Sequence, residues 1–158
     1  MSALRKRLRS RRGMSFTELL MAVAIMGILF SAIAAGMNSA ATAYRQSVAV
    51  ADAQSLGVNV VNALENELRY ARNIKSEGGT WFFDSASFGP EVSISSDSRG
   101  RVQVGGEDLL AEGAYPSGLE ADAKVTGYSN GLFTLKVTVT GDLIDPRETT
   151  VTIRAMNK

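Results

Sequence analysis

The chain of 158 residues contains no cysteine and no histidine. Without cysteine it has no disulfide, no thiolate nucleophile and no lipid-modified cysteine anchor. Without histidine, the common zinc sites and catalysis by a Ser-His-Asp triad are excluded. We therefore expect a protein that is not an enzyme. A membrane-tethered enzyme that relies on Asp or Ser residues is the alternative.

Charged residues are also missing from Leu19 to Tyr44, where Leu, Ile, Val, Met, Phe and Ala dominate. About 20 apolar residues suffice to cross a bilayer as a helix. The pattern predicts a transmembrane helix over residues 14–40. Glu18 lies at its N-terminal edge, where a charge costs about 2.5–3.5 kcal/mol, so this carboxylate needs a functional reason. An interfacial carboxylate without a partner is the alternative interpretation.

The small residues Gly27, Ser31 and Ala35 recur every four residues inside this apolar run. Such a stripe lets two membrane helices approach closely. In a segment this rich in alanine it also arises by chance, so both interpretations stay open.

A basic segment precedes the apolar run and contains no acid. Its six basic residues are Arg5, Lys6, Arg7, Arg9, Arg11 and Arg12. Removing these six from the 17 basic residues leaves 11 against 16 acids, a charge of about −5 for the rest of the chain. Because basic residues beside a membrane helix stay on the cytoplasmic side, we expect the N-terminus inside. Binding of nucleic acid by the arginines is the alternative, but the acidic remainder offers phosphates no general attraction, and no nucleic-acid partner is predicted.

An ordinary secretory signal would also place an apolar segment near the N-terminus. The small-x-small patterns Ala32-Ile33-Ala34 and Ser39-Ala40-Ala41 are of the kind that a standard signal peptidase accepts. The apolar run is long for a signal peptide, however, and Glu18 interrupts its start. We therefore expect the helix to be retained.

The stretch Gly13-Met14-Ser15-Phe16-Thr17-Glu18-Leu19-Leu20 resembles the class III signal of type IV prepilins and type II secretion pseudopilins. The resemblance implies that a prepilin peptidase cuts between Gly13 and Met14. It implies that residues 1–13 are a leader that is removed, that Met14 becomes the methylated N-terminus, and that Glu18 is the family's glutamate. Met14 stands where phenylalanine is most common in the family.

The role of Glu18 can be stated in physical terms. Beside the freed α-amine of a neighbouring subunit, its carboxylate gains an opposite charge in a medium of low dielectric constant. Breaking such a pair by removing one member typically costs about 3–5 kcal/mol. The pair would therefore set the axial register between subunits.

The resemblance also implies a location and partners. It implies a single-pass protein of the cytoplasmic (inner) membrane with an extracytoplasmic globular domain, incorporated into a pilus or pseudopilus. Its partners would be the prepilin peptidase, other pilin or pseudopilin subunits, the inner-membrane assembly platform and membrane lipid. A minor or tip-initiating subunit is favoured, because Leu64 to Ile74 resembles the helix end of minor pilins and because a disulfide is absent. A signal-anchored extracytoplasmic binding domain that never polymerises is the alternative.

Residues 41–78 are predicted to continue the helix in amphipathic form, and Gly78-Gly79 to end it. Apolar residues recur every three or four positions, which is the period of one helix face. This stripe consists of Leu56, Gly57, Val60, Val61, Leu64, Leu68 and Ala71.

From residue 79 to residue 158 the apolar period changes to two, which predicts β-strands. The clearest hairpin joins Lys124–Ser129 to Leu132–Thr140 through Asn130-Gly131, because Asn-Gly is the strongest two-residue turn signal. A further turn is predicted at Asp145-Pro146. The remaining short strands are expected around Trp81–Phe83, Val92–Ser95, Arg101–Val104, Leu109–Leu110 and Thr150–Arg154. The fold class is α+β: a long N-terminal helix packed on an antiparallel sheet, as in pilins.

Four further clusters are candidate functional sites that also have plainer interpretations. Asp142, Asp145 and Glu148 offer oxygen ligands for Ca²⁺, but we favour turn formation and solubility and expect no cofactor. The acids Glu107, Asp108 and Glu112 are expected to be a solvated edge. Trp81-Phe82-Phe83 is expected in the core rather than as a contact surface. The serines Ser93, Ser95, Ser96 and Ser98 have no general base nearby in sequence.

Overall fold

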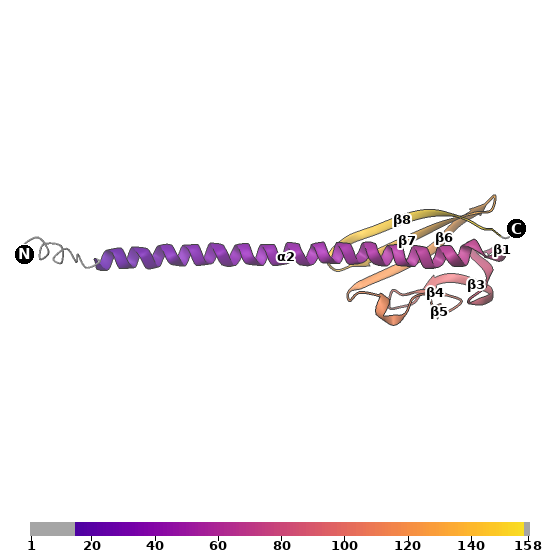
Figure 1. Cartoon of the computed structure of the whole chain (residues 1–158), viewed down its shortest axis with the longest axis horizontal. Coiled ribbons are helices and arrows are strands. Elements are labelled where there is room, and N and C mark those ends of the chain that lie inside the picture. The colour runs from indigo at the N-terminus through magenta and orange to yellow at the C-terminus, as the bar shows by residue number, and fades with distance from the viewer. Residues whose placement is uncertain (1–14, 157–158) are drawn as a thin grey trace, which may run out of the picture. The chain divides into compact units, whose positions relative to one another are not determined.

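The computed structural model describes residues 15–156 (Figure 1). The chain divides into two compact units, one up to Tyr44 and one from Arg45 onward, and the helix α2 (Phe16–Arg69) contributes to both. The leader, Gly13 and Met14 lie outside the described residues. The strands and the short 3-10 helix are β1 (Arg72–Glu77), β2 (Thr80–Ser85), β3 (Gly89–Ser96), β4 (Val102–Val104), β5 (Glu107–Asp108), η1 (Glu112–Ala114), β6 (Leu119–Ser129), β7 (Leu132–Gly141) and β8 (Ile144–Arg154).

The first unit contains the part of α2 up to Tyr44. It has no Pro to interrupt the hydrogen-bond ladder, and nearly all its described side chains are exposed. By length and composition alone, α2 is a helix that can cross a membrane.

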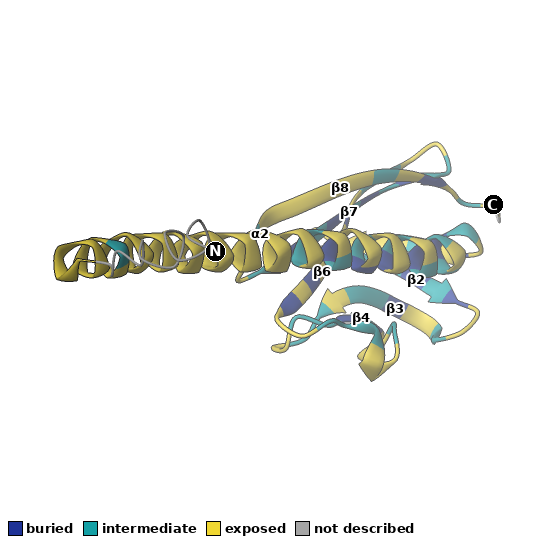
Figure 2. Ribbon diagram, turned by 60° about the vertical axis from the view of Figure 1, so that its left-hand side comes forward, coloured by how far each residue is buried: buried dark blue, intermediate teal, exposed yellow. Residues whose placement is uncertain are grey.

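In the second unit, one face of α2 packs on the strands. The buried positions of the helix recur every three or four residues: Ala53, Leu56, Val60, Leu64 and Leu68. In Figure 2 buried residues are dark blue, and on α2 they occur along the part of the helix beside the strands. Leu56, Val60, Leu64 and Leu68 of the predicted stripe are buried, which confirms its centre. Gly57 and Val61 lie beside these residues and are half-buried. A Cβ added to Gly57 would lie 3.6 Å from Cγ2 of Val139, so helix and sheet are in direct contact.

The strands form two antiparallel sheets, where the sequence analysis expected one. The five-stranded sheet has the order β1-β2-β3-β4-β5, and the three-stranded sheet has the order β6-β7-β8. As predicted, Asn130-Gly131 joins β6 to β7, with Ser129 opposite Leu132. The face of β7 predicted to be apolar is buried, through Phe133, Leu135, Val137 and Val139.

The two sheets meet beside Gly100. Its carbonyl accepts the N–H of Ala121 at 2.8 Å, and the hydroxyl of Ser96 donates to Asp122 at 2.6 Å. A Cβ at position 100 would lie 2.4 Å from the Cβ of Glu120, and φ is +67° there. Only glycine allows this close approach of the sheets.

The predicted end of the helix at Gly78 was wrong. The helix ends at Arg69, and Arg72–Glu77 forms strand β1, paired with β2. Gly78 and Gly79 have φ of +58° and +85° and join Glu77 to Thr80. A pair of residues with positive φ is what a two-residue β-hairpin requires, so the Gly-Gly signal marks a hairpin turn and not a helix stop.

The predicted turn at Asp145-Pro146 was also wrong, because both residues lie inside β8. The chain turns between Gly141 and Ile144, which face each other in the ladder. Strand β8 is an edge of its sheet, and the register shifts beside Gly141. A proline is tolerated in a strand at such an edge or bulge, since it has no N–H to donate.

Polar contacts fix the C-terminal end of α2. The carboxylate of Glu67 accepts the hydroxyls of Ser85 at 2.6 Å and Ser87 at 2.8 Å, which ties the loop after β2 to the helix. The carbonyl of Arg69 accepts the N–H of Met156 at 2.7 Å. This bond satisfies one of the carbonyls that a helix end leaves without an intrahelical partner.

The helix–sheet core predicts the result of a matched pair of substitutions on α2. Leu64→Ala removes a fully buried side chain and should lower the free energy of unfolding of the second unit by about 2–5 kcal/mol. Val58→Ala, at a position that is 57% exposed, should change it by less than about 0.5 kcal/mol. Denaturant unfolding of the full chain measures both, and equal effects would contradict the packing.

Candidate functional site

Glu18 lies in the first turn of α2 and is engaged there by its own chain. The backbone N–H of Ser15 donates to Oε2 of Glu18 at 3.0 Å. The N–H of Leu19 donates to the carbonyl of Ser15 at 3.1 Å, the first bond of the helix, and the hydroxyls of Ser15 and Thr17 lie 2.6 Å apart. Ser15 is therefore the N-cap and Glu18 the third helical residue, whose carboxylate reaches back to the N-cap amide as in a capping box.

Sequence reasoning missed this contact, although its signal is in the sequence. A Ser three residues before a Glu, directly ahead of an apolar run, is the signature of a helix N-terminus. The pattern was interpreted only through the membrane and a neighbouring subunit. The structure adds a partner for Glu18 within the same chain.

The helix surface that follows Glu18 is apolar and exposed. Phe16 is 75% exposed and Phe30 is 68% exposed. Other large apolar side chains that are exposed there are Leu19, Leu20, Met21, Val23, Ile25, Met26, Ile28, Leu29, Ile33 and Met37. Contiguous apolar surface of this extent marks a membrane or protein contact.

Polar side chains in this part of the helix hydrogen-bond to the helix itself. The hydroxyl of Ser31 donates to the carbonyl of Ile28 at 2.7 Å, and that of Thr42 donates to Asn38 at 3.0 Å. Such bonds hide the hydroxyl from an apolar medium. An added Cβ at Gly27 would meet no atom within 4 Å, so close packing along Gly27, Ser31 and Ala35 stays a prediction.

The comparisons with known proteins identify this region. Residues 8–34 match the prokaryotic N-terminal methylation motif, which covers the end of the basic segment from Arg9 on, Glu18 and the start of the apolar helix. The chain carries the class III signal typical of type IV prepilins and type II pseudopilins. This motif implies processing by a prepilin peptidase, and the long helix packed on antiparallel sheets is a pilin-like α+β fold. No curated protein and no solved structure matches the chain.

The structure does not bring the calcium candidates together into a metal site. Glu148 pairs instead with Lys136, 2.7 Å away across the strands. Asp142 lies in the turn before β8, and Asp145 is exposed at its start. Within residues 15–156, no group of three or more acidic, His or Cys side chains is arranged to hold a metal ion. Of the three acids only Asp142 lies in a turn, whereas Asp145 and Glu148 lie on strand β8.

Two of the three acids expected as a solvated edge, Asp108 and Glu112, belong to an ion network. The guanidinium of Arg101 lies 3.7 Å from Asp108 and 3.2 Å from Glu112. Gln103 donates to Asp108 at 2.8 Å. Glu107 and Glu112 themselves are exposed. The network holds the β4–β5 hairpin and the following turn against each other.

Asp97 organises the turn between β3 and β4. Its carboxylate accepts the backbone N–H groups of Arg101 at 2.8 Å and Arg99 at 2.9 Å, and Nε of Arg99 at 2.8 Å. The bond from the Arg101 amide is the largest cause that lowers the pKa of Asp97 from its ordinary value of 3.8, and the Arg99 bonds add to it. The charged form of Asp97 therefore stabilises this turn.

The predicted core position of the aromatic run is confirmed for Phe83, which is fully buried. Trp81 is half-buried and packs edge-on against Tyr128, with ring centroids 6.0 Å apart. Phe83 packs in the same way against Phe133, at 6.4 Å. These rings join the five-stranded sheet to the three-stranded sheet.

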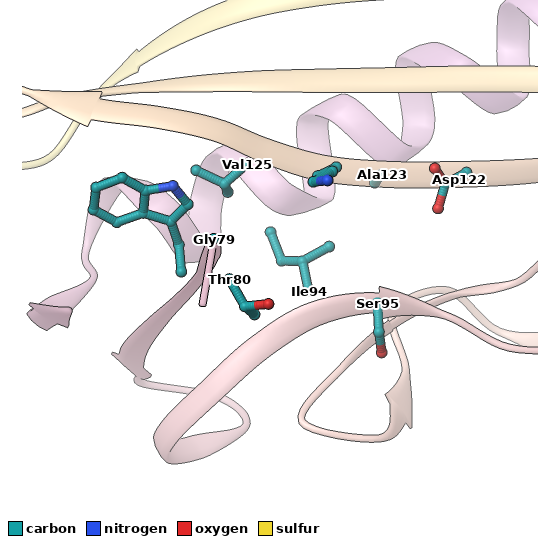
Figure 3. A pocket seen from close by; sticks show the side chains of 9 residues that line it. Gly79, Thr80, Ile94, Ser95, Asp122, Ala123 and Val125 are labelled. Atoms are coloured by element: carbon teal, nitrogen blue, oxygen red, sulfur yellow. The ribbon is translucent and has the colours of Figure 1, made fainter. Parts of the chain in front are cut away.

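A small cavity of about 150 Å³ lies where β3 and β6 face each other. Figure 3 shows Ile94 and Ser95 on β3 below it, with Asp122 and Val125 on β6 above. Its complete lining is Gly79, Thr80, Trp81, Ile94, Ser95, Asp122, Ala123, Lys124 and Val125. The Asp122 carboxylate of this lining accepts the hydroxyl of Ser96.

The lowered pKa of Asp97 predicts a pH dependence. Because the folded-state pKa is below the unfolded one, its contribution to stability is present above about pH 4 and is lost as the pH falls through the folded-state value. Asp97→Asn should therefore be less stable than the parent at pH 7, and the difference should shrink between about pH 5 and pH 2. Denaturant unfolding across this range measures it; a difference that stays constant with pH would contradict the assignment.

Proposed function

We propose that the chain is a structural subunit of a type IV pilus or a type II secretion pseudopilus. The methylation motif over residues 8–34 carries this proposal. Prepilin peptidase cuts between Gly13 and Met14, removes residues 1–13 and methylates the amine of Met14. The exposed apolar surface of α2 that follows is the surface through which subunits then pack.

The proposed location is the cytoplasmic (inner) membrane before assembly and the filament afterwards. The six basic residues of the leader support an N-terminus on the inside and a globular domain outside. Residues 14–40 span the bilayer, and residues from 41 onward belong to the extracytoplasmic part. A single long, apolar helix near the N-terminus in the described chain supports one membrane span.

Assembly draws on the charge of Glu18. In the proposed filament, its carboxylate pairs with the α-amine of an adjoining subunit, and the pair fixes how far one helix slides along the next. The inner-membrane assembly platform and other pilin or pseudopilin subunits are the partners in this step. The attraction between the two charges is stronger between packed apolar helices than in water, because the local dielectric constant is lower.

Within the family we propose a minor or tip-initiating role. The absence of cysteine supports it, since no disulfide can close the C-terminal region. The helix-end resemblance between Leu64 and Ile74 supports it only as far as Arg69, because Arg72 to Ile74 belong to strand β1. The proposed role is structural and not enzymatic.

The test of this function compares two acids on the same helix. Glu18→Ala should leave cleavage after Gly13 intact and lower incorporation into filaments by more than about tenfold, because it removes one member of the proposed pair. The control is Glu65→Ala, which removes an acid from the globular part of the same helix. Glu65 pairs with Arg69 of its own chain, so this substitution should leave incorporation unchanged.

Incorporation is measured as the ratio of sheared filament fraction to cleaved membrane pool. Normal incorporation of Glu18→Ala would contradict the register role. In a third outcome, the parent and the variants all insert in the membrane and never appear in the filament fraction. That result would instead indicate an anchored binding domain.

A further inference from the structure

The bond between Ser15 and Glu18 uses only one of the two oxygens of the Glu18 carboxylate. Oε2 of Glu18 accepts the Ser15 N–H at 3.0 Å. A carboxylate has two oxygens and about four sites that accept hydrogen bonds, so one bond leaves capacity for a second partner. Among residues 15–156, the bond from Ser15 to Oε2 is the side-chain hydrogen bond that Glu18 makes.

We infer that Ser15 is a positioning residue: its backbone amide holds the Glu18 carboxylate at the start of its own helix before assembly, with the second oxygen left for the amine of an adjoining subunit. This inference rests on the proposed function. It deepens the role of Glu18, because it states how the carboxylate is held in the subunit that has not yet assembled.

The contact does not depend on processing. Both of its atoms belong to residues after the proposed cut, Ser15 and Glu18, and the bonded N–H belongs to the peptide that links Met14 to Ser15. The same bond can therefore form in the precursor and persist after residues 1–13 are removed. Cleavage then adds a charged amine one residue before the cap.

The contact also explains how a lone subunit tolerates an acid at the edge of an apolar helix. The first amides of a helix have no intrahelical partner and carry partial positive charge. A carboxylate in the first turn satisfies one of them and interacts favourably with the others. Glu18 therefore has a hydrogen-bond partner before assembly. An acid placed in the middle of the apolar run that follows would have no free helix amide from which to accept a hydrogen bond.

Three substitutions distinguish the hydrogen bond between Ser15 and Glu18 from the negative charge of Glu18. Glu18→Gln keeps the length of the side chain and an oxygen that accepts the Ser15 N–H, and loses the charge. Glu18→Asp keeps the charge and is one methylene shorter, so it does not reach back to the N-cap. Ser15→Ala keeps the backbone N–H and removes only the hydroxyl that contacts Thr17.

The first measurement is amide hydrogen exchange at Ser15 in the unprocessed full chain, in detergent micelles, by NMR. The parent, Glu18→Gln and Ser15→Ala should exchange at similar rates. Glu18→Ala and Glu18→Asp should exchange roughly fivefold faster, since the bond to the amide is lost. Exchange in Glu18→Ala that is no faster than in the parent would overturn the contact.

The second measurement is incorporation of the cleaved variants into filaments. Glu18→Asp should incorporate less than the parent although it keeps its charge, and Glu18→Gln should fail although it keeps the cap. Full incorporation of Glu18→Asp with fast Ser15 exchange would overturn the positioning role. If the exchange pattern holds and the parent itself never incorporates, the proposed function fails and Ser15 only caps the helix.

Discussion

The carboxylate of Glu18 at the start of an apolar helix constrains the whole N-terminal part of the chain. It is the last charged group before Arg45, and the apolar side chains around it are exposed. Such a group is costly in a membrane unless another group compensates it. The structure supplies the Ser15 amide within the chain, and the methylation motif implies a freed amine nearby. Under the proposed function, the Ser15 amide would hold this acid in the single subunit, and the freed amine of an adjoining subunit would pair with it after processing.

The helix α2 meets two different environments, and its sequence changes accordingly. Up to Tyr44, apolar residues occur all around the helix, which suits a medium without water. From Arg45 on, the buried apolar residues form one stripe that belongs to the core shared with the strands, and polar residues such as Asn62 and Asn66 lie on the exposed side. A continuous helix without proline can carry both patterns, because the backbone satisfies its own hydrogen bonds in either environment.

Sequence patterns predicted the features that depend on local periodicity. The buried face of β7, the Asn130-Gly131 hairpin and the centre of the helix stripe follow from alternation, turn chemistry and helical spacing, and the structure confirms them. The two errors have a common cause: Gly78-Gly79 and Pro146 were assigned their commonest roles, whereas strand pairing decides which turn is made. The split into two sheets was not predictable, because local periodicity identifies strands but does not say that β5 and β6 are left unpaired with each other.

The mass of the mature N-terminus tests the central claim most directly. We expect the protein isolated from membranes or filaments to begin at Met14 and to be one methyl group heavier than residues 14–158. That result would establish the freed, modified amine on which the role of Glu18 depends. A chain that retains its arginine-rich leader, or one cut near Ala34 so that Glu18 is lost, would contradict the account.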